Sequence, residues 1–485
     1  MRLKRLVSGI LALMLVCTMV TGCSKNSANE DNKGTATPEA AKAASADTAV
    51  GAPKSGEKVK ITIGDWPTPD NEQYQYMEDL KKKMNEMYPD IEIVTDEYSY
   101  SVDTFLPKAA SGQLPNLYRT WFTEANKIIN AGYAEDITEV LKKNNVSTNI
   151  NPDLLALCEK EGHYYGLPTS AYSMSMMYNV DLFKKAGLVD EKGIPLFPKT
   201  WEEAAKTAVT IKEKTGKYGF FYPTKNNQGG WMFMNIAWGF GADFEKQVDG
   251  KWKAVFDSKE AAAALQYIKD LKWKYNVLPD NTLVDLSDFM KLYGSDQVAM
   301  GLCHIDMVKN IVKNTGMSKD NFALSTVPAG PAGKAALMGG SLYMISPGTT
   351  PAQQDAIMKY LELRGEAPEF TAETKAGFET QYKSRAQENS PVGPMGVRIW
   401  TSADRIKQEN DILDKYKNVN MDLWNAYCEH SSENIKPEPP VNSQELYGLL
   451  DALIQEVLTN KDADPQELLT KAAASFQKDY LDVAQ

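Results

Sequence analysis

Two neighbouring stretches decide the fold: GHYYGLPTSAYSMSMMYNVDLFKKAGL at residues 162–188 and PKTWEEAAKTAVTIKEKT at residues 198–215. Within the first, MSMMYN is a short apolar run bounded by turn residues, which predicts a buried strand. Asp181 can cap a short helix that stops at Gly187, and the Thr-x-x-Glu pattern beginning at Thr200 predicts a capping box at the start of a second helix. The order of strand, helix, loop and capped helix predicts an α/β fold.

The first patterned segment of the chain predicts a strand, a helix and a second strand. Apolar residues alternate over residues 59–63, helical spacing runs from a cap at Asp70 to Met87, and alternation resumes at Ile91. In a mostly parallel sheet, ligands bind beyond the carboxyl ends of the strands. Trp66 and Asp70 are therefore candidate binding residues, although Trp66 could equally cover the start of the helix.

Several stretches together resemble family 1 extracellular solute-binding proteins, the maltose-binding-protein-like receptors of sugar ABC transporters. The matching pieces are YGLP, DLFKKAGL and PKTWEE, followed by SGQLPNLYRTW (111–121), INAGYAEDIT (129–138) and FALSTVPAGPAGKAALMGGSLYMIS (322–346). The likeness extends over most of residues 58–480, with Asn116 standing where the family usually has Asp. It implies a two-lobed, periplasmic-binding-protein-like (Venus-flytrap) α/β fold with hinge crossings and a cleft between the lobes.

The resemblance also implies how the chain divides into lobes. Residues 58–171 and 324–375 are expected to form the N-terminal lobe, and residues 172–323 and 376–485 the C-terminal lobe. The first crossing then falls within the stretch that opens this section.

The beginning of the chain reads as a lipoprotein signal peptide over residues 1–22. Three basic residues precede an apolar run that is too short for an ordinary membrane-spanning helix. The sequence Val-Thr-Gly-Cys ending at Cys23 looks like a bacterial lipobox, which implies cleavage before Cys23, lipidation of its thiol and attachment to the outer side of the cell membrane. The alternative is a plain secretory signal with an incidental cysteine. Residues 23–57 contain no aromatic side chain and read as a flexible linker with a reach of roughly 30 Å.

Composition excludes several classes of protein. The formal net charge is −11, and loss of the three basic residues of the signal peptide, which holds no acidic residue, would make it −14. Such a chain is not expected to bind nucleic acid, which requires basic patches. Past Cys23 only Cys158, Cys303 and Cys428 remain, too few and too widely spaced for a disulfide framework or a zinc site. The histidines form no His-Glu-x-x-His motif, so we expect no metal and no cofactor.

The strongest candidate for ligand contact lies in the aromatic segment 220–244. Trp231, Asn235 and Trp238 are spaced at i, i+4 and i+7, which puts them on one face of a helix. A ring that stacks on a sugar, with an amide beside it, suits carbohydrate binding. The resemblance also implies a ligand-stacking aromatic where this helix opens, which matches Trp231. The alternative is an apolar core face, and for Trp238 the core is the better interpretation.

Further candidates come from the other matching pieces. Trp121 ends a predicted strand that would face the cleft, and Tyr172 lies in the crossing stretch. Gly340 and Ser341 would let the backbone approach a ligand closely. Asp306 stands near a position where the family often has an aromatic residue, which keeps a charged ligand open, although it could equally cap a helix. The tryptophans nearer the C-terminus, Trp400 and Trp424, are interpreted as packing residues.

Motifs of catalysis are absent from the sequence: it has no Gly-x-Ser-x-Gly, no phosphate-binding Gly-rich loop and no defensible Cys–His pair. We therefore expect a monomeric receptor, not an enzyme, that captures a carbohydrate ligand by hinge closure and delivers it to ABC transporter permease subunits. Oligosaccharides are favoured, while uronic acids, peptides and polyol phosphates stay open. A lipid-anchored glycoside hydrolase or lyase is the alternative and would need two carboxylates roughly 5–10 Å apart across the cleft. A surface adhesin, with no ligand-sized cavity between lobes, is a third possibility.

Overall fold

The computed structural model of the protein describes residues 58–71, 73–394 and 396–483, all within one compact unit. Cys23 and the predicted signal peptide and linker lie outside these residues. In the part of the chain described, no helix combines the length and the apolar composition that spanning a membrane requires.

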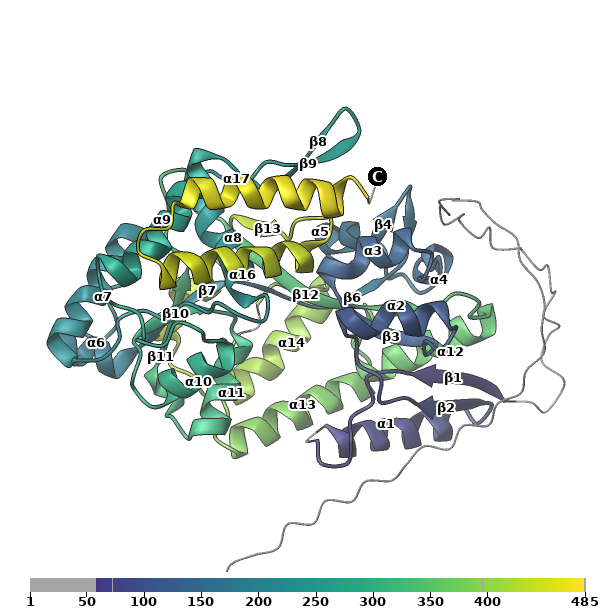
Figure 1. Cartoon of the computed structure of the whole chain (residues 1–485). Helices are drawn as coiled ribbons and strands as arrows, with labels where there is room; N and C mark the ends of the chain where they lie inside the picture. The colour runs from purple at the N-terminus through teal and green to yellow at the C-terminus, as the bar shows by residue number, and fades with distance from the viewer. Residues whose placement is uncertain (1–57, 72, 395, 484–485) are drawn as a thin grey trace, which may run out of the picture. The chain divides into compact units, whose positions relative to one another are not determined.

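Within the described residues, the first lobe is built around a six-stranded sheet (Figure 1). In spatial order its strands are β13 (Ile435–Pro437), β12 (Ala336–Ile345), β3 (Leu117–Trp121), β1 (Val59–Ile63) and β2 (Ile91–Thr95), and β6 (Leu167–Ser173) also pairs with β12. β1 and β2 are parallel, with Ile61 opposite Ile93, and α1 (Tyr74–Met87) connects them. The predicted strand–helix–strand start is therefore confirmed. Around this sheet lie α2 (Val102–Ala110), α3 (Ala125–Asn130), α4 (Thr138–Lys143), α5 (Pro152–Leu155), α12 (Pro351–Arg364) and the short hairpin of β4 (Glu159–Lys160) and β5 (His163–Tyr164).

The second lobe contains an antiparallel sheet in which β7 (Ser175–Asn179) lies between β10 (Met300–Cys303) and β11 (Phe322–Thr326). Every residue of β7 is buried, as the apolar run at this position predicts. The surrounding elements are α6 (Val180–Ala186), α7 (Trp201–Thr215), α8 (Gln228–Phe240), β8 (Glu245–Val248), β9 (Lys251–Ala254), α9 (Lys259–Trp273), α10 (Leu286–Gly294), α11 (Asp306–Thr315), α15 (Asn425–Cys428), α16 (Ser443–Thr459) and α17 (Pro465–Phe476). α16 packs against both α8 and α9.

Local capping explains where the helices of the opening stretch begin. The cap of α6 is Asn179, whose Oδ1 accepts the Leu182 N–H at 3.0 Å, so the predicted cap at Asp181 is wrong. Gly187 ends this helix in the left-handed conformation, as predicted. Thr200 does cap α7, because its hydroxyl accepts the Glu203 N–H at 3.1 Å.

Two predicted capping contacts differ from those in the structure. The Glu203 carboxylate accepts the backbone N–H of Lys199 at 2.7 Å, whereas a capping box would pair it with the N–H of Thr200. The predicted cap of α1 at Asp70 is also wrong: α1 is preceded by Gln73, and Asp70 instead accepts the Thr68 hydroxyl at 2.6 Å.

Two large hydrophobic cores define the lobes, and the chain passes between them more than twice, since Trp400 lies in the first core and Trp424 again in the second. Buried residues up to Leu167 belong to the first core, and those from Met174 to Leu337 belong to the second. The first core resumes at Met338. The return is therefore later than the boundary expected at residue 324, because β11 pairs with β7 in the second sheet. At the crossings β6 and β12 are antiparallel neighbours, and Met174 donates its N–H to the Leu337 carbonyl at 2.9 Å.

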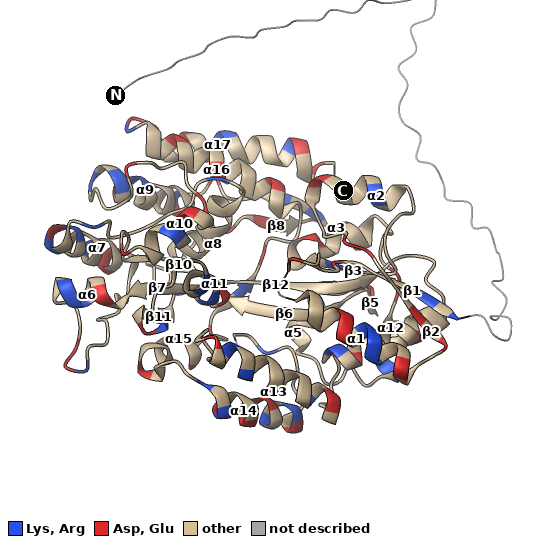
Figure 2. Cartoon of the chain, turned by 90° about the horizontal axis from the view of Figure 1, so that it is seen from below, with Lys and Arg blue, Asp and Glu red and all other residues tan. Residues whose placement is uncertain are grey.

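A third, small core lies apart from the two large ones, in a region that straddles the expected lobe boundary at residue 375 and was expected to belong mostly to the C-terminal lobe. It consists of Phe370, Tyr382, Val392, Ile412 and Leu413, and it joins α13 (Ala372–Gln387) to α14 (Ala403–Tyr416). Figures 1 and 2 both show this helix pair on the side of the molecule away from α16 and α17.

Candidate functional site

Two cavities adjoin the crossing strands, and Tyr172 of β6 lines both of them. The smaller has a volume of about 240 Å³ and the larger about 490 Å³. Only the larger reaches the range of about 300–1,000 Å³ that is usual for small-molecule sites.

The smaller cavity brings together aromatic rings from both lobes. Trp121, at the end of β3, is 43% exposed, and Trp231 lies in the first turn of α8 and packs against the core of the second lobe. The Tyr172 ring is perpendicular to that of Trp231, with the ring centroids 6.3 Å apart. The remaining described residues of the wall are Thr123, Asn226, Asn227, Gln228, Leu286, Gly340, Glu438, Gln444 and Tyr447. Aromatic faces beside side-chain amides offer both stacking and hydrogen bonds to a hydroxyl-rich ligand.

Glu438 is the one carboxyl group among the described residues of this smaller wall. Tyr447 donates its hydroxyl to Glu438 Oε1 at 3.2 Å. Burial raises the pKa of Glu438 to about 8, against the opposing effect of hydrogen bonds from Tyr447 and Trp231. The carboxyl group is therefore protonated at neutral pH, and it can both donate and accept hydrogen bonds. Glu438 was not among the residues predicted from the sequence, because its neighbours in the chain do not distinguish it from a surface glutamate.

Gly340 and Ser341 stabilise the pairing of β12 with its neighbouring strands. A Cβ on Gly340 would lie 2.2 Å from the Ser170 carbonyl oxygen, so glycine is required for the close pairing of β12 with β6. Gly340 also lines the smaller cavity, whereas Ser341 lines neither cavity. The Ser341 hydroxyl is buried and accepts hydrogen bonds from Arg119 at 2.6 and 3.0 Å.

Besides Ser341, three of the candidate residues lie outside both cavities. Trp66 is 4% exposed in the core of the first lobe, and its indole donates to Glu78 at 3.1 Å. Asp70 lies in an exposed turn. Asn235 is fully buried and accepts the N–H of Leu337 at 2.8 Å, which ties α8 to β12 at the return crossing.

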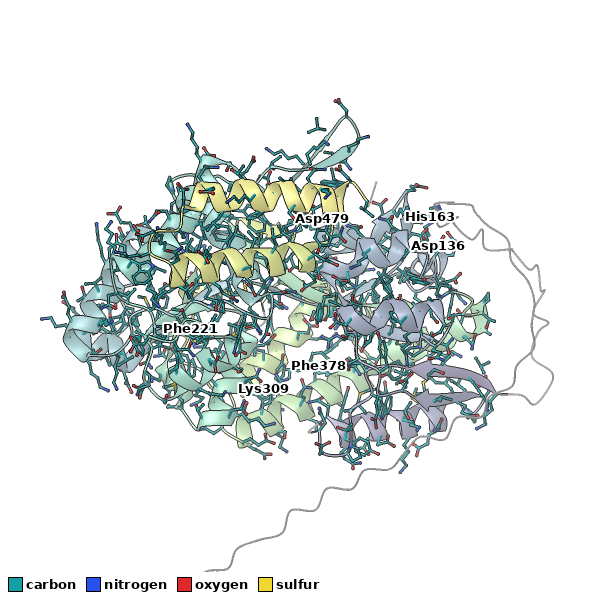
Figure 3. The ribbon with its side chains drawn as sticks, in the orientation of Figure 1. Asp136, His163, Phe221, Lys309, Phe378 and Asp479 are labelled. Atoms are coloured by element: carbon teal, nitrogen blue, oxygen red, sulfur yellow. The ribbon has the colours of Figure 1, made fainter. Side chains whose placement is uncertain are left out.

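The larger cavity is walled by β6, the start of α11, the helix pair α13–α14 and the loop between them. Asp306 lines it from the first turn of α11, but Ile305 precedes the helix and no capping bond from Asp306 is present among the described contacts. Beside it, the His304 ring stacks on Tyr172 with centroids 4.9 Å apart, and burial lowers the pKa of His304. Figure 3 labels two further wall residues, Lys309 on α11 and Phe378 on α13.

Trp400 and Trp424, interpreted from the sequence as packing residues, both line the larger cavity although they are only 5% and 3% exposed. Trp400 packs in the core of the first lobe and Trp424 in that of the second, so the cavity has walls from both. The sequence carries no signal for this arrangement, because α13 and α14 come together only through the third core. In the described part of the chain no group of three or more His, Cys, Asp or Glu side chains is placed to hold a metal ion.

Comparison with known proteins gives a family match over residues 79–376, described as bacterial extracellular solute-binding protein. A binding protein of Brucella abortus (strain 2308) is 24% identical over 286 residues, which cover 57% of this chain and 64% of that relative, somewhat less than two thirds of its length. The arabinooligosaccharide-binding protein of Bacillus subtilis is 24% identical over 359 residues, with 71% and 75% of the two chains covered. The sn-glycerol-3-phosphate-binding periplasmic protein UgpB of Escherichia coli (strain K12) is 22% identical over 368 residues, with 70% and 80% covered.

Solved structures share the fold. The GacH receptor of Streptomyces glaucescens, determined unliganded and with acarbose, superposes with a TM-score of 0.65 at 18% identity over 87% of this chain and 98% of that one. UgpB from Mycobacterium tuberculosis, determined with glycerophosphocholine, gives a TM-score of 0.65 at 14% identity over 86% and 98% of the two chains. The two-lobed α/β architecture implied by the sequence is thereby confirmed.

Proposed function

Since this chain belongs to the bacterial extracellular solute-binding proteins, we propose that it captures a carbohydrate, most simply an oligosaccharide, between its lobes and delivers it to the permease of an ABC importer. The observation that carries the proposal is the smaller cavity, where Trp121 from the first lobe and Trp231 from the second converge beside Tyr172. Rings from two bodies can hold one sugar only when those bodies come together.

Closure of the lobes follows from this division of the contacts. If each lobe supplies part of the ligand's surroundings, the ligand binds the closed state better and shifts the population towards it. β6 and β12 are the strands at which that motion would be absorbed. Away from them, Lys127 of α3 and Glu445 of α16 form an ion pair of 2.7 Å that links the lobes.

The carbohydrate assignment is supported by the names of the relatives. One curated relative binds arabinooligosaccharide, and the GacH receptor was crystallised with acarbose. The chemistry of the smaller cavity is compatible with binding and does not suggest hydrolysis: one carboxyl group lies among its described wall residues, whereas glycoside hydrolysis uses two. We therefore propose a receptor without enzymatic activity.

The location that we propose is the outer side of the cell membrane. Cys23 would carry the lipid anchor, and residues 23–57 would give the folded part freedom to reach a permease. One such lipidated chain is proposed to act as a monomer.

Calorimetric titration against a panel of neutral and acidic oligosaccharides tests the function, with Trp231→Ala as the diagnostic variant. We expect the variant to lose about tenfold to a hundredfold in affinity, because a buried aromatic contact contributes roughly 1–3 kcal/mol. Trp273→Phe is the matched control, since Trp273 is 44% exposed on α9 and lies outside both cavities. Unchanged affinity of a folded Trp231→Ala protein would contradict the site, and turnover of any panel sugar would contradict the receptor.

A further inference from the structure

The larger cavity differs from the rest of the molecule in the charge of its wall. The chain as a whole carries −11. Among the described residues of this wall, by contrast, cationic side chains outnumber acidic ones. The cations are Lys309, Arg364, Arg385, Arg398 and Arg405, and the acids are Asp306, Glu366 and Glu409. Figure 2 shows how charges of both signs are distributed over α13 and α14.

The most deeply buried acid of this wall is already neutralised. Glu409 is 6% exposed, and its two oxygens accept hydrogen bonds from Arg405 Nε at 2.8 Å and from an Arg398 nitrogen at 3.2 Å. Arg405 also donates to the backbone carbonyls of Gly365 and Ala367. These hydrogen bonds hold the cavity wall together. The two arginines offset the negative charge of Glu409, so Glu409 does not repel an anion.

The two other acids repel an anion only weakly. The side chain of Asp306 is 75% exposed, so water screens its charge. Glu366 faces Arg364 and Arg405, whose charges favour its ionised form, while burial acts more strongly in the opposite direction and raises its pKa.

Two donors of the wall lack an acceptor in the described part of the chain. Arg385 lies over the Tyr382 ring, 5.9 Å from the ring centroid, and has no ion pair or side-chain hydrogen bond among the described residues. Trp424 is 3% exposed, and its indole N–H is buried without a described hydrogen-bond partner. Of these two donors, the half-buried Arg385 is the one whose charge is open to an anion that enters the cavity.

We propose that the larger cavity receives an anionic group, a carboxylate or a phosphate, carried by the captured carbohydrate, and that Arg385 binds it. Tyr172, Phe378 and Trp400 offer the apolar faces on which the attached sugar or polyol chain lies. This inference rests on the proposed function, because it names the class of solute that the receptor takes.

The first test compares matched ligands on the unmodified protein by calorimetry at low salt. The carboxylate arm contains galacturonate, alginate-type and glucuronate-bearing oligosaccharides, each beside its methyl ester, and the phosphate arm contains sugar phosphates and glycerophosphodiesters beside their dephosphorylated forms. Neutral xylo-, arabino-, malto- and cello-oligosaccharides complete the panel. We expect the tightest ligand to be anionic, and its neutral partner to bind about tenfold to a hundredfold more weakly, since hydrogen bonds to charged groups are worth about 1.5–3 kcal/mol.

The second test asks whether Arg385 supplies the positive charge that binds the anion. Arg385→Met keeps an unbranched stem, and it should weaken binding of the anionic ligand about tenfold more than binding of its neutral partner. Lys383→Met is the matched control: it removes the same charge from the same helix at an exposed position outside the cavity wall. Urea denaturation of both variants without ligand shows whether each is folded.

The outcomes separate this inference from the proposed function. A neutral oligosaccharide as the tightest ligand, or equal binding of an anion and its neutral partner, would overturn the inference and leave the receptor in place. An equal loss for both members of a pair in Arg385→Met would remove Arg385 from the anion site. Binding to no member of the panel would count against the proposed function and against the inference with it.

Discussion

At the scale of single residues, Glu438 shows how burial decides the state of a group in the candidate site. Burial raises its pKa from the ordinary value of 4.5 to about 8, and the negative charge of Glu124 acts in the same direction. The folded protein therefore holds a proton at neutral pH that the unfolded chain has released. The unfolded state binds fewer protons between these two pKa values, so the stability of the fold decreases as the pH rises from about 5 to about 8.

Glu438→Gln should remove part of this pH dependence, because glutamine has the shape of the protonated acid and cannot ionise. We expect the variant to unfold at the same temperature as the unmodified protein near pH 5 and at a higher temperature near pH 8.5, as measured by differential scanning calorimetry. Some slope should persist, since burial also raises the pKa of Glu245 to about 8. Glu429→Gln, at an exposed position close by and without an ion pair among the described residues, is the control and should leave the difference between the two pH values unchanged. A constant offset between variant and parent at both pH values would argue against a protonated Glu438.

The sequence placed Trp231 at a cavity wall correctly, its contact with a ligand stays a prediction, and helical spacing alone did not separate cavity residues from core residues. Trp231 lines the smaller cavity, while Asn235, one turn later on the same face of α8, is fully buried and bonded to β12. A helical face that points to a ligand and one that points to a core have the same period. Only the position of β12 tells them apart, and that position depends on residues about a hundred positions away.

At the scale of elements, the start signals of the helices were largely readable because they are local. Thr200 caps the helix that follows it, as the sequence predicted, and Ser258, Thr350 and Asp464 cap theirs with side chains of the same local kind. The helix pair α13–α14 could not be assigned to its own small core, since its packing depends on contacts between segments that share no local pattern.

The packing of α8 on α16 gives a sharp prediction at this scale. A Cβ at Gly230 would lie 2.3 Å from the carbonyl oxygen of Tyr447 and 2.6 Å from its Cα, so the two helix backbones would have to move apart. Gly230→Ala should therefore lower the free energy of unfolding by about 1–3 kcal/mol. Urea denaturation followed by circular dichroism measures this change.

Gly377→Ala is the opposite control for that experiment. Gly377 lies in α13 with no atom within 4 Å of an added Cβ, so alanine should raise the free energy of unfolding by about 0.5–1 kcal/mol through helix propensity alone. Destabilisation of similar size in both variants would mean that the close approach at Gly230 is not the cause.

At the scale of the whole molecule, the sequence predicted the two-lobed architecture, because the matching pieces are distributed over most of the folded part of the chain. The boundary predicted at residue 324 for the return to the first lobe came too early. The sequence of β11 resembles the start of the strand that follows it, and only its pairing with β7 assigns it to the second lobe. The two cavities could not be predicted, because their walls combine β6, α8, α11, α13 and α16.

The proposed anchor is tested on the complete chain. Cys23→Ala should release the protein into the medium or leave it uncleaved, because the thiol that would carry the lipid is gone. Fractionation of cells and medium, followed by immunoblotting, measures the distribution, and Cys17→Ala within the apolar run is the matched control. Processed Cys23→Ala protein that stays on the membrane would contradict lipidation at this site.

The central position of β12 has a consequence for the order in which the chain acquires its structure. Arg119 and Ser341 hydrogen bond across the pairing of β3 with β12, yet they are 222 residues apart. Synthesis at about 5–20 residues per second leaves the earliest strands waiting on the order of tens of seconds for this partner. Contacts between such distant residues also slow folding itself, because a long loop must close first. The first lobe therefore cannot complete its sheet until β12 and β13, far along the chain from β1, have been made.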